Sequence, residues 1–410
     1  MKVKNSVWYL ADKGGRALLN LVVFAWVSRA MGPEGLGWLG VGLAWMALTS
    51  GLGVPALEAW LIAQWPKTPQ DEVGGVFRKA VWTHTVLTGG ALVLVGLAGM
   101  PGWGLGILAA SGLFRSSDAF RTYLEAHGQA RRTVLFEGVA FAAGVVAKMG
   151  CVWADADWGW YALAFALEPI LAWPLLWRAV RPLAGISLRE VLVPLPDAAE
   201  WGAFVRQILP QILAFALFLG QLRLGTLLLE AWSTPAEVGH WTAALRLLEI
   251  WSFVPWALTA TLYPAAVRAQ PRSKERRGLI QQMALRSLGS AAVLALPLSV
   301  GAAWGIAAVY GPDFADAAPV LRIAAFNLFP WFAYLFWTRW MHVEQLGNRI
   351  PVFAGVYVLL QALLAFLWIP DHGAIGAAWA SVLSGAIALA AALAVSLGQK
   401  GAVHPNSSQA

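Results

Sequence analysis

The stretch VWYLADKGGRALLNLVVFAWVSR, residues 7–29, decides the fold class. It is long and apolar enough to cross a bilayer, because a hydrocarbon core about 30 Å thick needs about 20 mainly apolar residues in a helix. Asp12, Lys13 and Arg16 nevertheless lie in its first half. A charged side chain at mid-bilayer costs about 2.5–3.5 kcal/mol on insertion scales, so these residues indicate a protein-lined or hydrated interior. The stretch is too long and too charged for a cleaved signal peptide, and we expect it to remain as the first membrane helix.

The rest of the chain repeats this membrane pattern. Of its 410 residues, 59% are hydrophobic and only 12% are charged, which is unlike a soluble globular protein. Backbone groups in lipid must be hydrogen-bonded within the segment, and this favours helices over open strands. The sequence therefore predicts an all-α integral membrane protein with twelve transmembrane helices. The predicted spans are 7–28, 37–62, 78–99, 103–124, 134–153, 158–177, 204–228, 239–263, 284–310, 317–340, 350–369 and 374–397.

Basic residues gather in alternate loops between these spans. Loops rich in Lys and Arg face the cytoplasm, so we expect a multi-pass protein of the cell inner (plasma) membrane with both termini in the cytoplasm. The net charge of +7 is explained by inner loops that face anionic lipid, and we expect no nucleic-acid partner.

Two parts of the sequence resemble each other. GPEGLGWLGVGLAW at 32–45 has a partial echo in TPAEVGHWTAALRL at 234–247. The offset covers six predicted spans, an even number, so the two copies have the same orientation, as in transporters built from parallel repeats. The sequence therefore predicts an N-terminal lobe at 1–180 with helices 1 to 6, an amphipathic linker at 181–202, a C-terminal lobe at 203–398 with helices 7 to 12, and a disordered cytoplasmic tail at 399–410.

Charged residues inside the predicted spans form the candidate binding site. Arg121, Arg286 and Arg339 lie close enough to inner helix ends for their side chains to reach water. The acidic residues near inner ends are Glu58, Glu125 and Glu137, which leaves seven basic residues deep in the spans against four acidic ones. A surplus of cations in a medium of low dielectric attracts an anion, and Arg makes bidentate contacts with phosphate. The alternative is that each pair is a self-contained ion pair that holds helices together, and for any single pair the sequence leaves both open. The candidate binding residues are Arg16, Arg115, Arg223, Arg246, Lys13 and Arg322, and their candidate charge partners are Asp12, Asp118 and Glu249.

Several other kinds of chemistry are not indicated. The sequence has no G-x-x-x-x-G-K-[ST] motif, no H-E-x-x-H motif and no Cys/His cluster, so we expect no ATPase site, no metal site and no cofactor. GLGWLG at 35–40 formally matches G-x-G-x-x-G, but it opens a membrane helix with no strand before it. A membrane glycan polymerase or ligase is disfavoured because the predicted outer loops are short, and we expect the protein not to be an enzyme.

An ordered set of segments resembles the oligosaccharide (O-antigen type) flippases of the multidrug/oligosaccharidyl-lipid/polysaccharide (MOP) exporter superfamily. The segments are DKGGRALLNLVVFAWVSRAMGPEGLGWLGV from residue 12, ILPQILAFALFLGQLRLGTLLLEAWSTPAEVGHWTAALRLLE from residue 208, YGPDFADAAPVLRI at 310–323 and IPDHGAIGAAWASVLSG at 369–385. The lipid II flippases are similar too, with cavity arginines on helices 1 and 8. Arg16 and Arg246 match those arginines by helix number.

The resemblance implies a fold, a substrate and a mechanism. Two six-helix bundles would form a V, as in the multidrug exporters of the superfamily, around a central cavity. Polyprenyl-pyrophosphate-linked oligosaccharide would move from the cytoplasmic to the outer leaflet by alternating access. Arg16, Arg115, Arg223 and Arg246 would then surround the pyrophosphate, with Lys13 and Arg322 near the two mouths. The lipid bilayer and the glycan polymerase machinery are the further expected partners, and a cation-coupled multidrug antiporter, which needs surplus acid, is the alternative.

Overall fold

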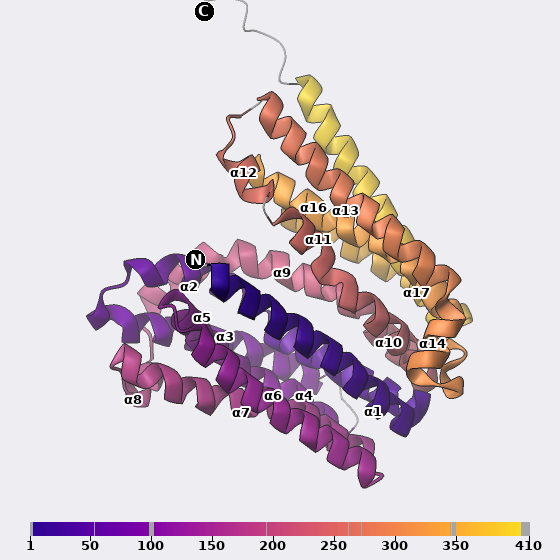
Figure 1. Ribbon diagram of the computed structural model, residues 1–410, viewed down its shortest axis with the longest axis horizontal. Helices are drawn as coiled ribbons and strands as arrows, with labels where there is room; N and C mark the ends of the chain where they lie inside the picture. Colours follow the sequence, from indigo (N-terminus) through magenta and orange to yellow (C-terminus); the bar gives the residue numbers. More distant parts are fainter. Residues whose placement is uncertain are drawn as a thin grey trace, which may run out of the picture. The chain divides into compact units, whose positions relative to one another are not determined.

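The chain folds as a succession of helices, shown in Figure 1 as a computed structural model. The structure describes residues 3–52, 54–97, 102–193, 195–260, 262–271, 273–344, 346 and 350–402, and the side chains of 3–14, 17, 55, 97, 256 and 392–402 lie outside the described part. These ranges contain helices and turns and no strand, which confirms the all-α fold class. Most of the tail expected at 399–410 also lies outside the described residues.

The chain divides into two compact units, Met1–Arg223 and Leu224–Ala410. The boundary lies inside a long helix, α9 (Ala198–Trp232), beyond the segment 181–202 in which the sequence predicts the linker. The other elements of the first unit are α1 (Val3–Gly51), α2 (Val54–Gln64), η1 (Trp65–Lys67), η2 (Gln70–Glu72), α3 (Val73–Leu97), α4 (Trp103–Ser111), η3 (Gly112–Ser117), α5 (Asp118–Ala126), α6 (Ala130–Trp153), α7 (Trp158–Ala184) and α8 (Leu188–Leu192).

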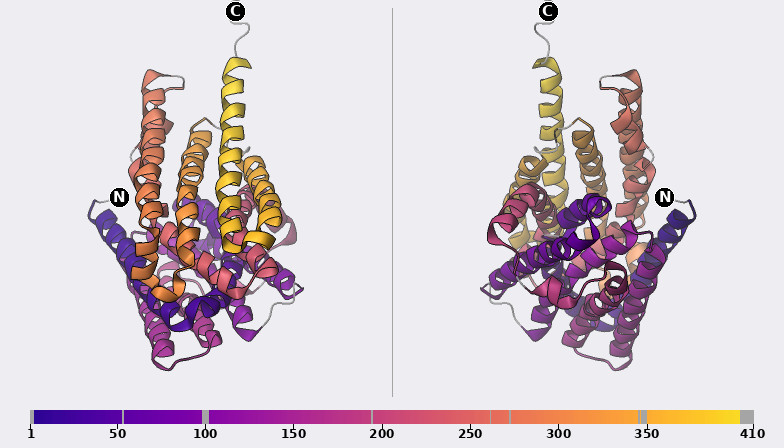
Figure 2. Two further views of the ribbon diagram at one scale, coloured as in Figure 1. Left: turned by 90° about the vertical axis from the view of Figure 1, so that its right-hand side faces the viewer. Right: turned by 90° about the vertical axis from the view of Figure 1, so that its left-hand side faces the viewer.

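The second unit contains α10 (Pro235–Glu249), η4 (Ile250–Ser252), α11 (Phe253–Thr259), α12 (Leu262–Arg268), α13 (Lys274–Val300), α14 (Ala302–Tyr310), η5 (Pro312–Phe314), α15 (Ala317–Ala324), η6 (Ala325–Asn327), α16 (Leu328–Val343) and α17 (Ile350–Ala402). Within this unit α13 packs along α16, and α17 lies against α16 (Figure 2). Contacts at both ends show that α13 and the α15–α16 segment are antiparallel. A side-chain nitrogen of Arg276 bonds to the carbonyl of Val343, and Ser299 Oγ donates to the carbonyl of Arg322 at 2.9 Å.

Seven helical segments among the described residues are long and apolar enough to cross a membrane, or eight if one bent pair counts as a single span. Apart from single turn residues, the described residues of all twelve apolar runs lie on helical segments, which agrees with a multi-pass membrane protein. The first two runs share α1, which continues into α2, and the last two share α17. The count of twelve spans stays a prediction that this arrangement allows.

Each of the two long helices contains a glycine kink. Gly32 in α1 has φ of 67° and precedes Pro33, and Gly373 in α17 has φ of 53°. Positive φ is disfavoured for residues with a Cβ atom, and proline removes a backbone N–H, so both positions interrupt the helical hydrogen bonding. The chain therefore changes direction at both points, between the spans that the sequence predicts on either side.

Three predicted spans contain a 3₁₀ segment. The run 103–124 is interrupted by η3, 239–263 by η4, and 317–340 by η6. The apolar length of a run does not by itself distinguish an α-helix from a helix that contains a 3₁₀ turn. A 3₁₀ segment within a helix has a tighter winding and often marks a functional position. One of these interruptions, η3, carries Arg115.

The core of the first unit is built around aromatic rings. The centre of the Trp65 ring lies 4.8 Å from the centre of the Phe77 ring and 4.9 Å from that of the Tyr123 ring. Trp65 Nε1 donates a hydrogen bond to Thr122 Oγ1 at 3.1 Å. These contacts join the turn after α2 to α3 and α5, so they fix α5 in place. Since α5 carries several charged residues, the aromatic core also positions the candidate site.

The predicted linker packs against the first unit. Gln70 Nε2 donates to the carbonyl of Ala184 at 2.7 Å, and Trp201 Nε1 donates to Thr83 Oγ1 at 2.8 Å. Lys79 Nζ lies 3.0 Å from a carboxylate oxygen of Glu200. These bonds tie both ends of the segment to η2 and α3.

Candidate functional site

A network of charged side chains surrounds Arg121 in the first unit. Arg121 Nε lies 3.1 Å from Asp118 Oδ1 and 3.7 Å from Glu137 Oε1. Arg121 Nη2 lies 3.2 Å from Glu58 Oε2, and Nη1 lies 3.8 Å from Glu125 Oε1. The Arg121 side chain is only 10% exposed, although four carboxylates surround it. The sequence suggested that Arg121 extends to water from a helix end; this was wrong, because residues from α2 and α6 enclose it.

Two candidate binding arginines join this network through shared carboxylates. Arg16 Nη1 lies 3.7 Å from Glu137 Oε2, and Arg115 Nε lies 3.4 Å from Asp118 Oδ2. Because Glu137 and Asp118 also contact Arg121, the five charges alternate in sign in the order Arg16, Glu137, Arg121, Asp118, Arg115. The structure thus brings together two residues that are about 100 positions apart in the sequence.

The two outer arginines differ in their surroundings. The Arg16 side chain is 15% exposed; its Nη2 donates to the carbonyl of Val134 at 3.0 Å, and its guanidinium lies 5.8 Å from the Phe141 ring centre. The Arg115 side chain is 50% exposed. Arg115 is therefore held by Asp118 on one side and remains accessible on the other.

A small pocket in the first unit has Arg115 on its wall. Its polar lining consists of Glu58, His84, Arg115, Ser116 and Asp118, and its apolar lining comes from Val54, Leu57, Leu61, Ala80 and Ala119. His84 is buried, and its Nε2 lies 2.9 Å from the carbonyl of Gly112. A carbonyl only accepts, so Nε2 carries the hydrogen. Ser116 Oγ accepts a hydrogen bond from Trp173 Nε1 at 3.0 Å, which fixes the next residue after Arg115.

Local sequence explains how one short segment supplies so many of these groups. Asp118, Arg121 and Glu125 are three and four residues apart, so they share one face of α5. Arg115 lies in η3, and because a 3₁₀ segment is wound more tightly than an α-helix, its side chain points in a different direction from that of an α-helical residue at the same position. Glu58 and Glu137, by contrast, come from other helices, and no sequence spacing indicates that they meet α5.

Among the side chains that the structure describes, the ion pairs of this network join three arginines to four carboxylates, a formal charge of −1 (3 − 4). These described side chains therefore do not carry the surplus of cations that the sequence suggested. The network includes Glu58, Glu125 and Glu137, which the sequence places near inner helix ends and outside its count of deep charges. All three contribute carboxylates to the network.

The other candidate residues lie elsewhere. In the second unit, Arg246 Nη1 lies 2.8 Å from Glu249 Oε2 at the end of α10, and both side chains are partly exposed. Arg322 is exposed on α15, and Arg223 is half-buried on α9 at the end of the first unit. The side chains of Asp12 and Lys13 lie outside the described residues.

The sequence also underestimated how deeply two arginines of the second unit are buried. Arg339, expected to extend to water, is 9% exposed; it donates to Thr259 Oγ1 and lies 5.4 Å from the Tyr263 ring centre. Arg276, assigned to an inner loop, is 7% exposed and lies 3.6 Å from Glu344 Oε1. These contacts join α13 and α16 to neighbouring segments, so they are structural.

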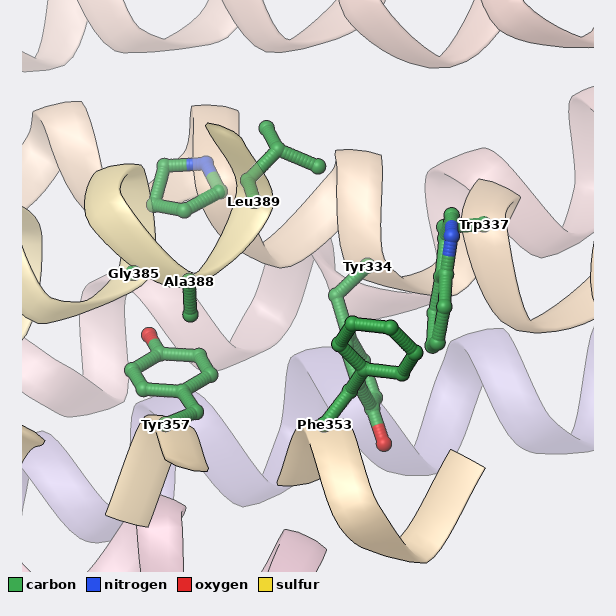
Figure 3. A pocket seen from close by; sticks show the side chains of 8 residues that line it. Tyr334, Trp337, Phe353, Tyr357, Gly385, Ala388 and Leu389 are labelled. Carbon is green, nitrogen blue, oxygen red and sulfur yellow. The ribbon is translucent and has the colours of Figure 1, made fainter. Parts of the chain in front are cut away.

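A second pocket lies in the second unit and is aromatic. Tyr334 and Trp337 of α16 and Phe353 and Tyr357 of α17 line it, together with Pro330, Gly385, Ala388 and Leu389. Figure 3 shows the Tyr357 ring on one side of the space and the Phe353, Tyr334 and Trp337 rings on the other. Its lining carries no charged side chain. Among the residues whose side chains are described, no cluster of His, Cys, Asp and Glu could hold a metal ion.

No model of a known protein family matches the sequence, and no curated protein matches it. The fold, however, is similar to those of solved transporters. A structure described as the lipid II flippase MurJ in an inward closed conformation has a TM-score of 0.75 at 11% identity, over 96% of this chain and 87% of that chain. An inward-facing MATE-family multidrug resistance transporter of the MOP superfamily has a TM-score of 0.64 at 15% identity, over 95% and 96%.

A third similar structure is a MOP superfamily transporter from Pyrococcus furiosus, whose description states that the reverse polarity of its binding pocket suggests a different function. Its TM-score is 0.55 at 15% identity, over 96% of this chain and 94% of that chain. At these identities the similarity establishes the fold alone. The protein therefore has the all-helical membrane fold that MurJ and the MATE transporters share.

Proposed function

We propose that this protein is a flippase that moves polyprenyl-pyrophosphate-linked oligosaccharide repeat units from the cytoplasmic to the outer leaflet of the inner membrane by alternating access. In this proposal the chain crosses the membrane twelve times with both termini in the cytoplasm, and it supplies the glycan polymerase machinery. No bond is made or broken, so no catalytic residue is required.

The observation that supports the proposal most directly is that Arg115 is paired with one carboxylate and is still half-exposed. A guanidinium in a membrane segment is expensive unless it has a partner, and Arg115 has Asp118 at 3.4 Å, yet half of its side chain remains accessible at a pocket. Such a group is available to an anion, and its planar donors suit the oxygens of a phosphate. A fold similar to that of a lipid II flippase supports the same class of cargo.

The proposal assigns roles to the six candidate residues. Arg16, Arg115, Arg223 and Arg246 replace water around the pyrophosphate, and Lys13 and Arg322 contact it near the two mouths of the path. Asp12, Asp118 and Glu249 hold these cations in position.

Complementation of a flippase-deficient strain tests this assignment. Arg16→Ala, Arg115→Ala, Arg223→Ala and Arg246→Ala proteins that reach the membrane at the wild-type level should export less glycan than the wild type. Purified protein in vesicles should also move fluorescent undecaprenyl-pyrophosphate-linked sugar across the bilayer. Wild-type export by all four variants would remove the site assignment, and absence of flipping by the wild type would remove the function.

A cation-coupled multidrug antiporter is the second candidate, and one observation favours it. The described side chains of the network around Arg121 carry a formal charge of −1, and an acidic site in low dielectric attracts an organic cation or a coupling ion rather than a phosphate. The two candidates predict opposite results in one assay. Ethidium efflux from vesicles with an imposed proton or sodium gradient, without flipping of the lipid-linked sugar, would establish the antiporter.

A further inference from the structure

We infer that Arg121 is a positioning residue that holds Arg16 and Arg115 in place together, so that these two arginines act on the substrate as one unit. The inference rests on the proposed function, because it concerns the residues proposed to contact the pyrophosphate. Arg121 itself is nearly enclosed and has its guanidinium directed at carboxylates.

The geometry shows how one residue can act on two others. Arg121 Nε contacts Asp118 Oδ1, while Asp118 Oδ2 faces Arg115 at 3.4 Å. Glu137 Oε1 lies 3.7 Å from the same Nε, while Glu137 Oε2 faces Arg16 at 3.7 Å. Each bridging carboxylate therefore presents one oxygen to Arg121 and the other to an outer arginine.

Without Arg121, these carboxylates would lose the charge that orients them. Glu58, Asp118, Glu125 and Glu137 would then face each other without the cation that contacts all four of them. Like charges at short range in low dielectric repel, so the carboxylates would move apart and displace Arg16 and Arg115 with them. Both outer arginines would then lose their present positions.

A bridge of this kind also joins separate helices. Arg16 belongs to α1, Arg115 to η3, Arg121 to α5 and Glu137 to α6. A network in which all members share partners gives substitution effects that do not add, whereas independent sites give additive effects. Non-additivity is thus the property that distinguishes positioning through Arg121 from a general contribution to folding.

The test measures binding of undecaprenyl diphosphate to the full-length purified protein in nanodiscs, by quenching of tryptophan fluorescence. Arg16→Gln and Arg115→Gln should each raise Kd about tenfold, which corresponds to about 1.4 kcal/mol. Arg121→Gln should raise Kd by about as much as the double variant R16Q/R115Q. Adding R115Q to R121Q should change Kd by less than about threefold.

Arg276→Gln is the matched control. Arg276 is a buried arginine of the second unit with one carboxylate 3.6 Å away. Its replacement should lower the thermal unfolding temperature while leaving Kd near the wild-type value, and its effect should be independent of R115Q. If R121Q does not fold, Arg121→Lys replaces it. The lysine keeps the charge but lacks the forked guanidinium that contacts four carboxylates, so Kd should still rise. The effects of R121K and R115Q on the binding free energy should again be smaller together than their sum.

The outcomes separate the two levels of the argument. If the wild type binds undecaprenyl diphosphate and R16Q and R115Q weaken binding, but R121Q leaves Kd unchanged or adds fully to R115Q, the positioning role is overturned and the proposed function stands. If the wild type does not bind this probe, or if R16Q/R115Q binds as tightly as the wild type, the proposed substrate contacts fail and the positioning role fails with them.

Discussion

Loss of the carboxylate at Glu237 should destabilise the kink in α17. Glu237 Oε2 accepts a hydrogen bond from the backbone N–H of Ala374 at 2.7 Å, directly after Gly373. The helix that restarts there has unsatisfied N–H groups in its first turn, and the carboxylate acts as their cap. Replacing a cap by alanine costs about 0.5–2 kcal/mol, and hydrogen bonds to charged groups are worth about 1.5–3 kcal/mol, so Glu237→Ala should cost about 2 kcal/mol.

The same site predicts a coupling with Gly373. A Cβ atom at this position would lie 2.5 Å from Glu237 Oε2, and the φ of 53° is unfavourable for a residue with a side chain. Gly373→Ala should therefore cost at least the roughly 1–2 kcal/mol of the left-handed conformation, plus displacement of the carboxylate. In the double variant E237A/G373A the carboxylate is absent, so the total loss should be smaller than the sum.

Thermal unfolding of purified protein in detergent, scanned at one fixed rate, measures both effects. For a unit of 150–250 residues about 1 kcal/mol corresponds to about 2–4 °C, so Glu237→Ala should lower Tm by about 4–8 °C. Glu34→Ala is the control, since Glu34 is an exposed carboxylate beside the kink of α1 and should change Tm by less than about 2 °C. Equal Tm values for E237A and E34A would refute the capping role, and additive losses in the double variant would refute the contact with Gly373.

Three further substitutions test other parts of the structure. Asp118→Asn should cost about 1.5–3 kcal/mol because it removes the charged acceptor that contacts both Arg121 and Arg115, and this should appear as a fall in Tm in the same unfolding assay. Gly385→Ala should cost about 1–3 kcal/mol by overpacking, because its Cβ would lie 2.6 Å from Tyr357 Oη, and a Tm equal to that of the wild type would contradict this packing. Trp65→Phe should cost about 1 kcal/mol for the lost bond to Thr122 plus lost packing area, and Thr122→Val in the W65F background should add little in the same unfolding assay.

The positions of the membrane helices were largely readable from the sequence. A span needs a fixed length of apolar residues, so the described residues of the twelve apolar runs lie on helical segments apart from single turn residues. The change of direction near Gly32 was also indicated, because a Gly-Pro pair interrupts a helix. The 3₁₀ turns such as η3 could not be predicted from the sequence, since they depend on how the segment packs against neighbouring helices.

The site was readable only in part, for a related reason. The spacing of Asp118, Arg121 and Glu125 indicates one polar face of α5, because residues three and four apart on a helix are neighbours. That Glu58 and Glu137 approach the same face depends on the packing of α2 and α6 against α5, and no local pattern encodes it. The burial of Arg121 followed from those distant residues, so the sequence placed it in the wrong environment.

The composition of the network argues for a role beyond stability. Buried ion pairs contribute little to stability relative to apolar side chains of similar size, because removing charges from water offsets their mutual attraction. An all-apolar interior would thus hold α2, α5 and α6 together at least as well as seven charged side chains do. Arg121, moreover, contacts two carboxylates that also contact Arg16 and Arg115, and the Arg115 side chain is half-exposed. A network that stabilised only the fold would not require a guanidinium that is accessible at a pocket, and the proposed contact of Arg115 with a polar ligand accounts for this arrangement.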